Sequence, residues 1–165
     1  MEKMVGTRIN PIQAVGLMSG TSLDGIDLAY VHFWEEDGWK FNLQHTHYIP
    51  YSNQEKKELR HLMEVPAAEL LSAHARWGHR FGQEIRSWLN NIQQTPHLIA
   101  SHGHTIFHQP EKGFTFQLGV ATLCNEKLVY QWCTISEVPM LRLEDKELRW
   151  SHSVSFTCFP NTTIS

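Results

Sequence analysis

Small polar residues and glycines are concentrated in one bend near the start of the chain. Ser19-Gly-Thr-Ser-Leu-Asp-Gly25 separates an apolar run, residues 14–18, from an alternating segment, residues 26–31. Both flanking segments predict strands, and Asp24–Gly25 is typical of a hairpin turn because Gly accepts a positive φ freely and Asp tolerates it. Such a bend can direct backbone N–H groups and hydroxyls toward an anion. Asp24 and Asp27 add carboxylates, the usual partners of Mg²⁺ beside a phosphate.

The same bend is also compatible with an ordinary Gly/Ser-rich surface turn, since short loop motifs occur often without a function. It is not a Walker A loop, because no Lys follows the second Gly, and it is not a G-x-G-x-x-G fingerprint. The residues alone therefore leave an anion-binding loop and a plain surface turn as alternatives.

A second group of chemically capable residues lies farther along the chain. Residues 98–100 predict a short buried strand, and Ser101-His-Gly-His-Thr105 predicts a loop at its carboxyl end, where open α/β sheets bind ligands. His102, His104 and His108 suggest a metal site, since the spacing of His102 and His104 places them on one face of an extended segment. A zinc site needs three or four such ligands. No Cys or carboxylate completes the set. A small non-enzymatic α/β binding module with a His-rich metal loop is the alternative hypothesis to an enzyme.

Periodicity predicts the elements that must position these residues. Residues 39–51 predict a third strand, which completes an antiparallel meander. Ser52-Asn-Gln-Glu55 is a capping box that begins a helix ending before Pro66. Residues 67–92 predict a longer helix with one apolar stripe, on which His74 is expected to be a packed or rim histidine, and residues 114–119 predict another strand. The stripe consists of Leu70, Trp77, Phe81, Ile85, Trp88 and Ile92.

Composition restricts the class of protein. The chain has 165 residues, enough for one domain, with 41% hydrophobic and 19% charged residues, as in ordinary soluble globular proteins. A net charge of −3 gives no electrostatic basis for nucleic-acid binding, and no signal peptide or membrane-spanning run is expected. Three cysteines without a C-x-x-C pair suit a reducing cytoplasm. We therefore expect a cytoplasmic protein that binds neither nucleic acid nor membranes.

Gly16-Leu-Met-Ser-Gly-Thr-Ser-Leu-Asp-Gly-Ile-Asp27 closely resembles the opening motif of the anhydro-N-acetylmuramic acid kinases, sugar kinases of the actin-like ATPase superfamily. The element at residues 101–105 resembles the family's Ser-His-Gly-Gln-Thr, with His104 in place of Gln. The resemblance implies an α/β fold, namely a partial ribonuclease-H-like lobe in which a β-hairpin meander precedes helices and further strands.

The resemblance also implies an activity. The family hydrolyses the 1,6-anhydro bond of anhydro-N-acetylmuramic acid and phosphorylates the sugar from ATP to N-acetylmuramic acid 6-phosphate, which recycles cell-wall sugar. The implied cofactors are ATP and Mg²⁺, the implied partners are the anhydro amino sugar and ATP, and full-length members are expected to include homodimers.

By the same resemblance, individual residues have expected roles. Mg²⁺ would be held through the phosphates by Asp24 and Asp27. Ser101, His102, Gly103 and Thr105 would lie on the sugar side of the cleft. The family's general base is an Asp in a later Asp-Thr-Gly-Pro-Gly-Asn motif that these 165 residues do not contain. We therefore expect no catalytic base in this chain and no activity from it alone. The expected nucleotide-binding residues are Gly20, Thr21, Ser22, Leu23, Asp24, Gly25, Ile26 and Asp27.

The resemblance is lost after Gly119. Residues 127–165 show no helix or strand period, and the family's Thr-Gly-Ile-Pro-Val-Val-x-Asp-Phe-Arg-x-x-Asp segment is not visible. Read one base out of step, however, the codons of residues 132–140 permit Val-Tyr-Asp-Phe-Arg-Ser-Ala-Asp. We therefore predict a frameshift after Gly119 and no later than Lys127. The expected organisation is an incomplete N-terminal kinase lobe over residues 1–126 and an out-of-frame tail over residues 127–165.

Overall fold

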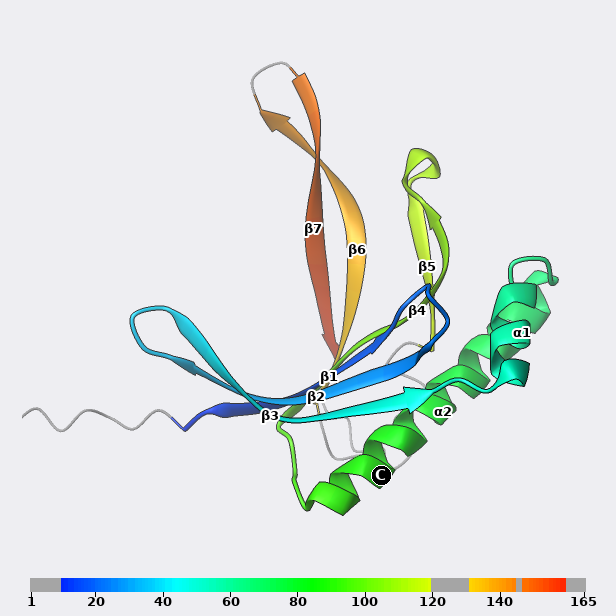
Figure 1. Ribbon diagram of the computed structural model, residues 1–165. Coiled ribbons are helices and arrows are strands. Elements are labelled where there is room, and N and C mark those ends of the chain that lie inside the picture. Colours follow the sequence, from blue (N-terminus) through cyan, green and yellow to red (C-terminus); the bar gives the residue numbers. More distant parts are fainter. Residues whose placement is uncertain (1–9, 120–130, 145–146, 160–165) are drawn as a thin grey trace, which may run out of the picture.

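Figure 1 shows the computed structural model, which describes the backbone of residues 10–119, 131–144 and 147–159 and the side chains of residues 10–119. The elements in chain order are β1 (Ile12–Ser19), β2 (Gly25–Glu35), β3 (Trp39–Pro50), α1 (Asn53–His61), α2 (Ala67–Ile92), β4 (Leu98–Gln109), the 3₁₀ turn η1 (Pro110–Lys112), β5 (Phe114–Leu118), β6 (Gln131–Glu144) and β7 (Glu147–Phe159).

The described strands form one mixed sheet in the order β3-β2-β1-β4-β6-β7, with β5 paired to β4. β1, β2 and β3 are antiparallel neighbours, which confirms the predicted meander. β1 pairs with β4 in parallel, and β4 pairs with β6 in parallel. Together with the two helices, this mixed sheet confirms the α/β class.

Both helices lie on one side of the meander, with α2 crossing beneath it (Figure 1). Alternate residues of β2, namely Ile26, Leu28 and Tyr30, are buried on the helix side. The predicted stripe of α2 packs there, with its central residues buried and its two end residues, Leu70 and Ile92, partly buried against the core. Burying a large apolar side chain contributes about 1.5–3 kcal/mol, so this stripe is a main source of stability. Its buried residues are Trp77, Phe81, Ile85 and Trp88.

Local signals define the helix ends. At the start of α1, the Ser52 hydroxyl accepts from the Glu55 N–H (3.2 Å) and the Glu55 carboxylate accepts from the Ser52 N–H (2.7 Å), which confirms the capping box. Helix α2 begins directly after Pro66 and ends at Ile92, and the C-cap residue Gln93 has a left-handed φ of 53°. Within the described residues, neither helix is long and apolar enough to span a membrane.

The structure corrects the expected loop at residues 101–105. Strand β4 does not end at residue 100 but continues to Gln109. Its register with β1 shifts instead, since Leu17 pairs with Ser101 whereas Ser19 pairs with His104. The additional residue in β4 forms a bulge, and Gly103 accommodates it with a φ of +69°. The strand therefore bends at this point and continues.

The structure describes two strands within residues 127–165. Although the sequence shows no strand period there, residues 131–144 and 147–159 form β6 and β7, which pair from Trp132↔Phe159 to Glu144↔Glu147. Residues 131–134 extend the main sheet beside β4, and the rest of the hairpin projects away from α2 (Figure 1). The predicted frameshift region beyond Gly119, residues 120–127, lies outside the described residues, so the boundary at residue 126 stays a prediction.

Candidate functional site

The bend between β1 and β2 is a tight turn, as predicted, but its special backbone position is not the predicted one. The Leu23 N–H donates to the Gly20 carbonyl (3.2 Å), and Leu23 adopts the positive φ, 58°. Gly25 instead begins β2 without a positive φ. A Cβ on Gly25 would overlap the Ile49 carbonyl oxygen and lie 2.8 Å from Tyr48 Cε2. Gly25 is therefore required by the close approach of β3.

Asp24 closes this turn with its carboxylate. Its Oδ1 accepts from the Ser22 hydroxyl (2.7 Å) and from the Gly25 N–H (3.0 Å). The hydrogen bond from Ser22, followed by the backbone hydrogen bonds, holds the pKa of Asp24 below its ordinary value, so the exposed carboxylate is ionised at neutral pH. The Tyr51 N–H donates to the Asp24 carbonyl (2.9 Å), which ties the turn to the end of β3.

A buried polar network lies beneath the turn. The Ser19 hydroxyl lies 2.6 Å from the Tyr51 hydroxyl and 2.8 Å from His104 Nδ1, and these side chains are only 1%, 4% and 3% exposed, respectively. Burial raises the pKa of Tyr51 to about 12 and lowers the pKa of His104 to about 4, so both groups are neutral at pH 7. The network joins the last residue of β1, the residue following β3, and the bulge of β4.

Two members of this network were missed by the sequence analysis. Ser19 continues the buried alternation of Val15 and Leu17, and a polar residue at a core-facing strand position needs a hydrogen-bond partner. That alternation could have identified Ser19 as a buried, hydrogen-bonded residue. Tyr51 lies at the end of the predicted third strand, but nothing in its neighbours identifies Ser19 as its partner.

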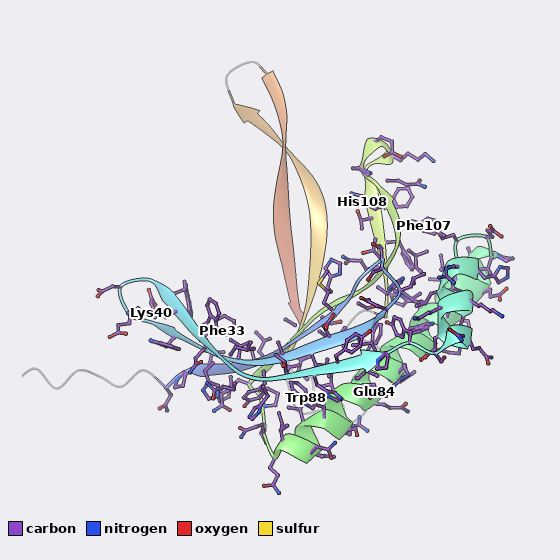
Figure 2. All side chains as sticks on the ribbon, in the orientation of Figure 1. Phe33, Lys40, Glu84, Trp88, Phe107 and His108 are labelled. Atoms are coloured by element: carbon purple, nitrogen blue, oxygen red, sulfur yellow. The ribbon has the colours of Figure 1, made fainter. Side chains whose placement is uncertain are left out.

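The three histidines of β4 do not converge. Because of the Gly103 bulge, His104 bonds to Ser19 on the helix side of the sheet. The His102 Nε2 atom instead lies 2.9 Å from the Gln117 amide. His102 also lines a hollow together with Asp27 and Tyr48. His108 lies on the projecting β4–β5 arm (Figure 2), where its Nδ1 is 3.1 Å from the Thr115 hydroxyl. Over the part of the chain whose side chains are described, no three His, Cys, Asp or Glu residues are grouped to hold a metal. The prediction that His102 and His104 share a face is therefore wrong.

Two hollows bring the predicted groups together. The larger, about 630 Å³, lies on the open sheet face and is lined in part by Asp27 from β2 and His102 from β4. The smaller, about 140 Å³, is lined by Thr21 from the turn and Thr105 from β4, together with Arg60 of α1. The larger hollow thus joins Asp27 of the expected phosphate side to His102 of the expected sugar side, and the smaller joins Thr21 and Leu23 to Thr105. Asp24 and Asp27 do not line a common hollow among these two.

The other two predicted sugar-side residues shape the backbone. Ser101 is buried, and its hydroxyl accepts from the Gly103 N–H (3.2 Å). A Cβ on Gly103 would overlap the Leu118 carbonyl oxygen of β5. Ser101 and Gly103 therefore stabilise the bulge that orients His102 and His104.

Comparison with known proteins identifies the family. The family model described as anhydro-N-acetylmuramic acid kinase matches residues 12–145. This chain belongs to that family. The match includes the turn, the bulge and all of β6, so it extends past Gly119.

Individual members of the kinase family align over most of this chain. The chain is 36% identical over 137 residues to the anhydro-N-acetylmuramic acid kinase of Pseudomonas putida, covering 79% of this chain and 35% of the relative. The enzyme of Pseudomonas fluorescens is 38% identical over 118 residues, covering 68% of this chain and 31% of the relative. The enzyme of Gluconobacter oxydans is 33% identical over 144 residues, covering 82% of this chain and 38% of the relative. The chain thus spans about a third of the length of these relatives.

Proposed function

We propose that this chain is part of an ATP-dependent kinase that hydrolyses 1,6-anhydro-N-acetylmuramic acid and phosphorylates it to N-acetylmuramic acid 6-phosphate. The observation that carries the proposal is the family match over residues 12–145. It is supported by the geometry of the β1–β2 turn, where the Thr21 and Ser22 N–H groups have no hydrogen-bond partner among the described residues. In this proposal these groups and the Thr21 hydroxyl bind phosphate oxygens of ATP.

The implied Mg²⁺ fits the donors at this turn. Asp24 offers an ionised, exposed carboxylate whose Oδ1 is fixed by Ser22 and Gly25, and Asp27 is a second exposed carboxylate. Mg²⁺ typically binds one or two carboxylates together with substrate phosphates and waters. When bound, the ion neutralises charge on the phosphates. The protein's contribution is to hold the carboxylates and the phosphate donors in fixed positions.

The sugar is proposed to bind on the open sheet face. The hollow there has room for a small ligand, and it carries the Asp27 carboxylate, the His102 imidazole and the Tyr48 ring. An imidazole and a carboxylate can hydrogen-bond sugar hydroxyls, while an aromatic ring can pack against the sugar ring. In this proposal, the sugar approaches the phosphate side in the hollow that Asp27 and His102 both line.

The finer structural and cellular expectations belong to the same proposal. The order β3-β2-β1-β4-β6, with β1, β4 and β6 parallel, supports a partial ribonuclease-H-like lobe. We further propose a frameshift between residues 119 and 127, a cytoplasmic location, and homodimers of the full-length form. Because phosphoryl transfer depends on positioning and charge stabilisation, a chain without the family's Asp-Thr-Gly-Pro-Gly-Asn motif is proposed to be inactive alone.

Activity assays test this proposal directly. The purified chain and a full-length version with the reading frame restored are each incubated with ATP, Mg²⁺ and 1,6-anhydro-N-acetylmuramic acid, and the products are identified by mass spectrometry. We expect N-acetylmuramic acid 6-phosphate from the full-length version only. A folded full-length version that forms no phosphorylated sugar would contradict the proposed function, and turnover by the chain alone would contradict its proposed inactivity.

A further inference from the structure

The phosphate-side turn has no cation of its own. Residues 19–27 contain two carboxylates and neither Lys nor Arg. The imidazole beneath the turn, His104, is buried and neutral at pH 7 because burial lowers its pKa to about 4. Polyphosphates carry several negative charges, and binding them beside Asp24 and Asp27 requires compensating positive charge. Any protein cation must therefore come from a neighbouring element.

Helix α1 brings two cations to the turn. Arg60 lines the 140 Å³ hollow together with Thr21 and Thr105. Lys56, four residues earlier, lies on the same side of the helix because residues four apart are neighbours on a helix surface. Lys56 is also close enough to Asp24 to favour the ionised carboxylate. Both side chains therefore face the turn from the same helix.

These two cations differ from Arg76 and Arg80 of α2, which form ion pairs. Arg76 bonds to Glu58 of α1 (2.8 Å), and Arg80 bonds to Glu55 (3.4 Å) and also pairs with Glu84. Within the side chains described, Lys56 and Arg60 have no carboxylate within ion-pair distance. The helix thus uses its acidic residues to dock α2 and leaves Lys56 and Arg60 available at the turn.

We propose that Lys56 and Arg60 are phosphate-binding residues that supply the positive charge missing from the β1–β2 turn. The proposal rests on the proposed function and assigns it two further residues. The Arg60 guanidinium can donate two parallel hydrogen bonds to phosphate oxygens, alongside the Thr21 N–H and hydroxyl. Lys56 acts as a mobile point charge near Asp24. The ligand class is an inorganic or nucleotide polyphosphate.

The alternative is that both residues are ordinary solvated side chains. Arg60 lies in the last turn of α1, where a cation is favoured by the helix dipole without any ligand. Stability measurements therefore cannot separate the two explanations, whereas ligand affinity can. Lys57 provides a matched control, because it lies next to Lys56 in the same helix, is exposed, and lines none of the hollows described above.

The test is a titration of the full chain with inorganic pyrophosphate, followed by the amide NMR signals of Thr21 and Ser22. The variants are Arg60→Ala, Lys56→Ala and Lys57→Ala, each checked by circular dichroism for unchanged helix content. We expect the Kd to rise about 5-fold or more for the first two variants, as for loss of a charge-assisted contact, and to stay unchanged for Lys57→Ala. Arg60→Lys should recover only part of the affinity, because it keeps the charge but loses the paired donors.

The outcomes separate this inference from the proposed function. If pyrophosphate shifts the Thr21 and Ser22 signals equally in the wild type, Arg60→Ala and Lys56→Ala, then the turn binds phosphate without α1 and this inference is overturned. If the wild type shows no shift at Thr21 or Ser22, the phosphate-binding role of the turn itself is overturned, and the inference with it.

Discussion

Acid should destabilise this protein through one buried histidine. His104 is 3% exposed and bonded to Ser19, and burial lowers its pKa from 6.5 to about 4. The unfolded chain takes up this proton below about pH 6.5, whereas the folded protein does so only near pH 4. The free energy of unfolding is therefore unaffected by His104 above pH 6.5 and falls progressively between these two pKa values. At about 1.4 kcal/mol per pKa unit, the full loss is about 3 kcal/mol.

The variant that isolates this effect is His104→Gln. Glutamine can still hydrogen-bond to Ser19 but does not titrate, so it removes the proton uptake while keeping a polar partner in the network. Carboxylates also titrate in this range, and they contribute equally to both proteins. The difference in pH dependence between the wild type and His104→Gln therefore reports His104 alone.

The assay is the urea midpoint by pulse proteolysis in dilute solution, measured from about pH 7 to about pH 4, with His79→Gln as the control because His79 is exposed on α2. We expect the wild type and His79→Gln to lose about 3 kcal/mol more than His104→Gln over this interval. Equal acid sensitivity of the wild type and His104→Gln would refute the burial of a neutral imidazole beneath the turn.

Four other predictions concern the turn, the edge strand and the reading frame. Gly25→Ala should lower the unfolding free energy by about 1–3 kcal/mol, because the new Cβ overlaps β3. Gly16→Ala, whose Cβ would meet nothing within 4 Å, should raise the unfolding free energy by about 0.4–1 kcal/mol. Equal urea midpoints for the two variants would contradict this prediction. In a full-length, active version, Asp24→Asn should lower kcat about 10²–10⁴-fold with little change in Tm, since Asn Oδ1 can still accept from the turn; normal kcat would show that the turn is not a phosphate site. The chain should aggregate through the exposed edge strand β3, so Phe41→Lys should reduce light scattering; unchanged scattering would exclude this edge. Sequencing the gene should reveal that a one-base change within codons 119–127 opens a long frame, and its absence would contradict the frameshift.

The elements predicted correctly are those that depend on local sequence signals. The capping box at Ser52 and Glu55 needs only residues three apart, and the stripe of α2 repeats over many turns, so a single-sequence pattern identifies both. The meander followed from alternation in β2 and from short connections. For these segments, the tertiary structure agrees with what the local chain prefers.

The features that the sequence analysis missed are those that depend on contacts between distant segments. Gly103 lies in the bulge of β4 with a positive φ, and the β5 backbone approaches too closely for any Cβ. No residue near Gly103 in the sequence indicates that approach. Gly25 was predicted to be needed for its φ, whereas it is needed because β3 passes close by. In both cases the identity of the glycine was informative, but its reason lay in another strand.

The sequence predicted two groups of site residues, the β1–β2 turn and residues 101–105, but not how the fold brings them together. The turn follows β1 and the bulge interrupts β4, and these strands are parallel neighbours, so both features lie at the same end of the sheet. The Gly103 bulge advances β4 by one residue, which rotates His104 to the helix side while His102 stays on the open face. Without that additional residue, His104 could not reach the Ser19 hydroxyl, and Ser19 would keep only Tyr51 as a partner. The bulge is thus what ties the phosphate-side turn to the strand that carries the sugar-side residues.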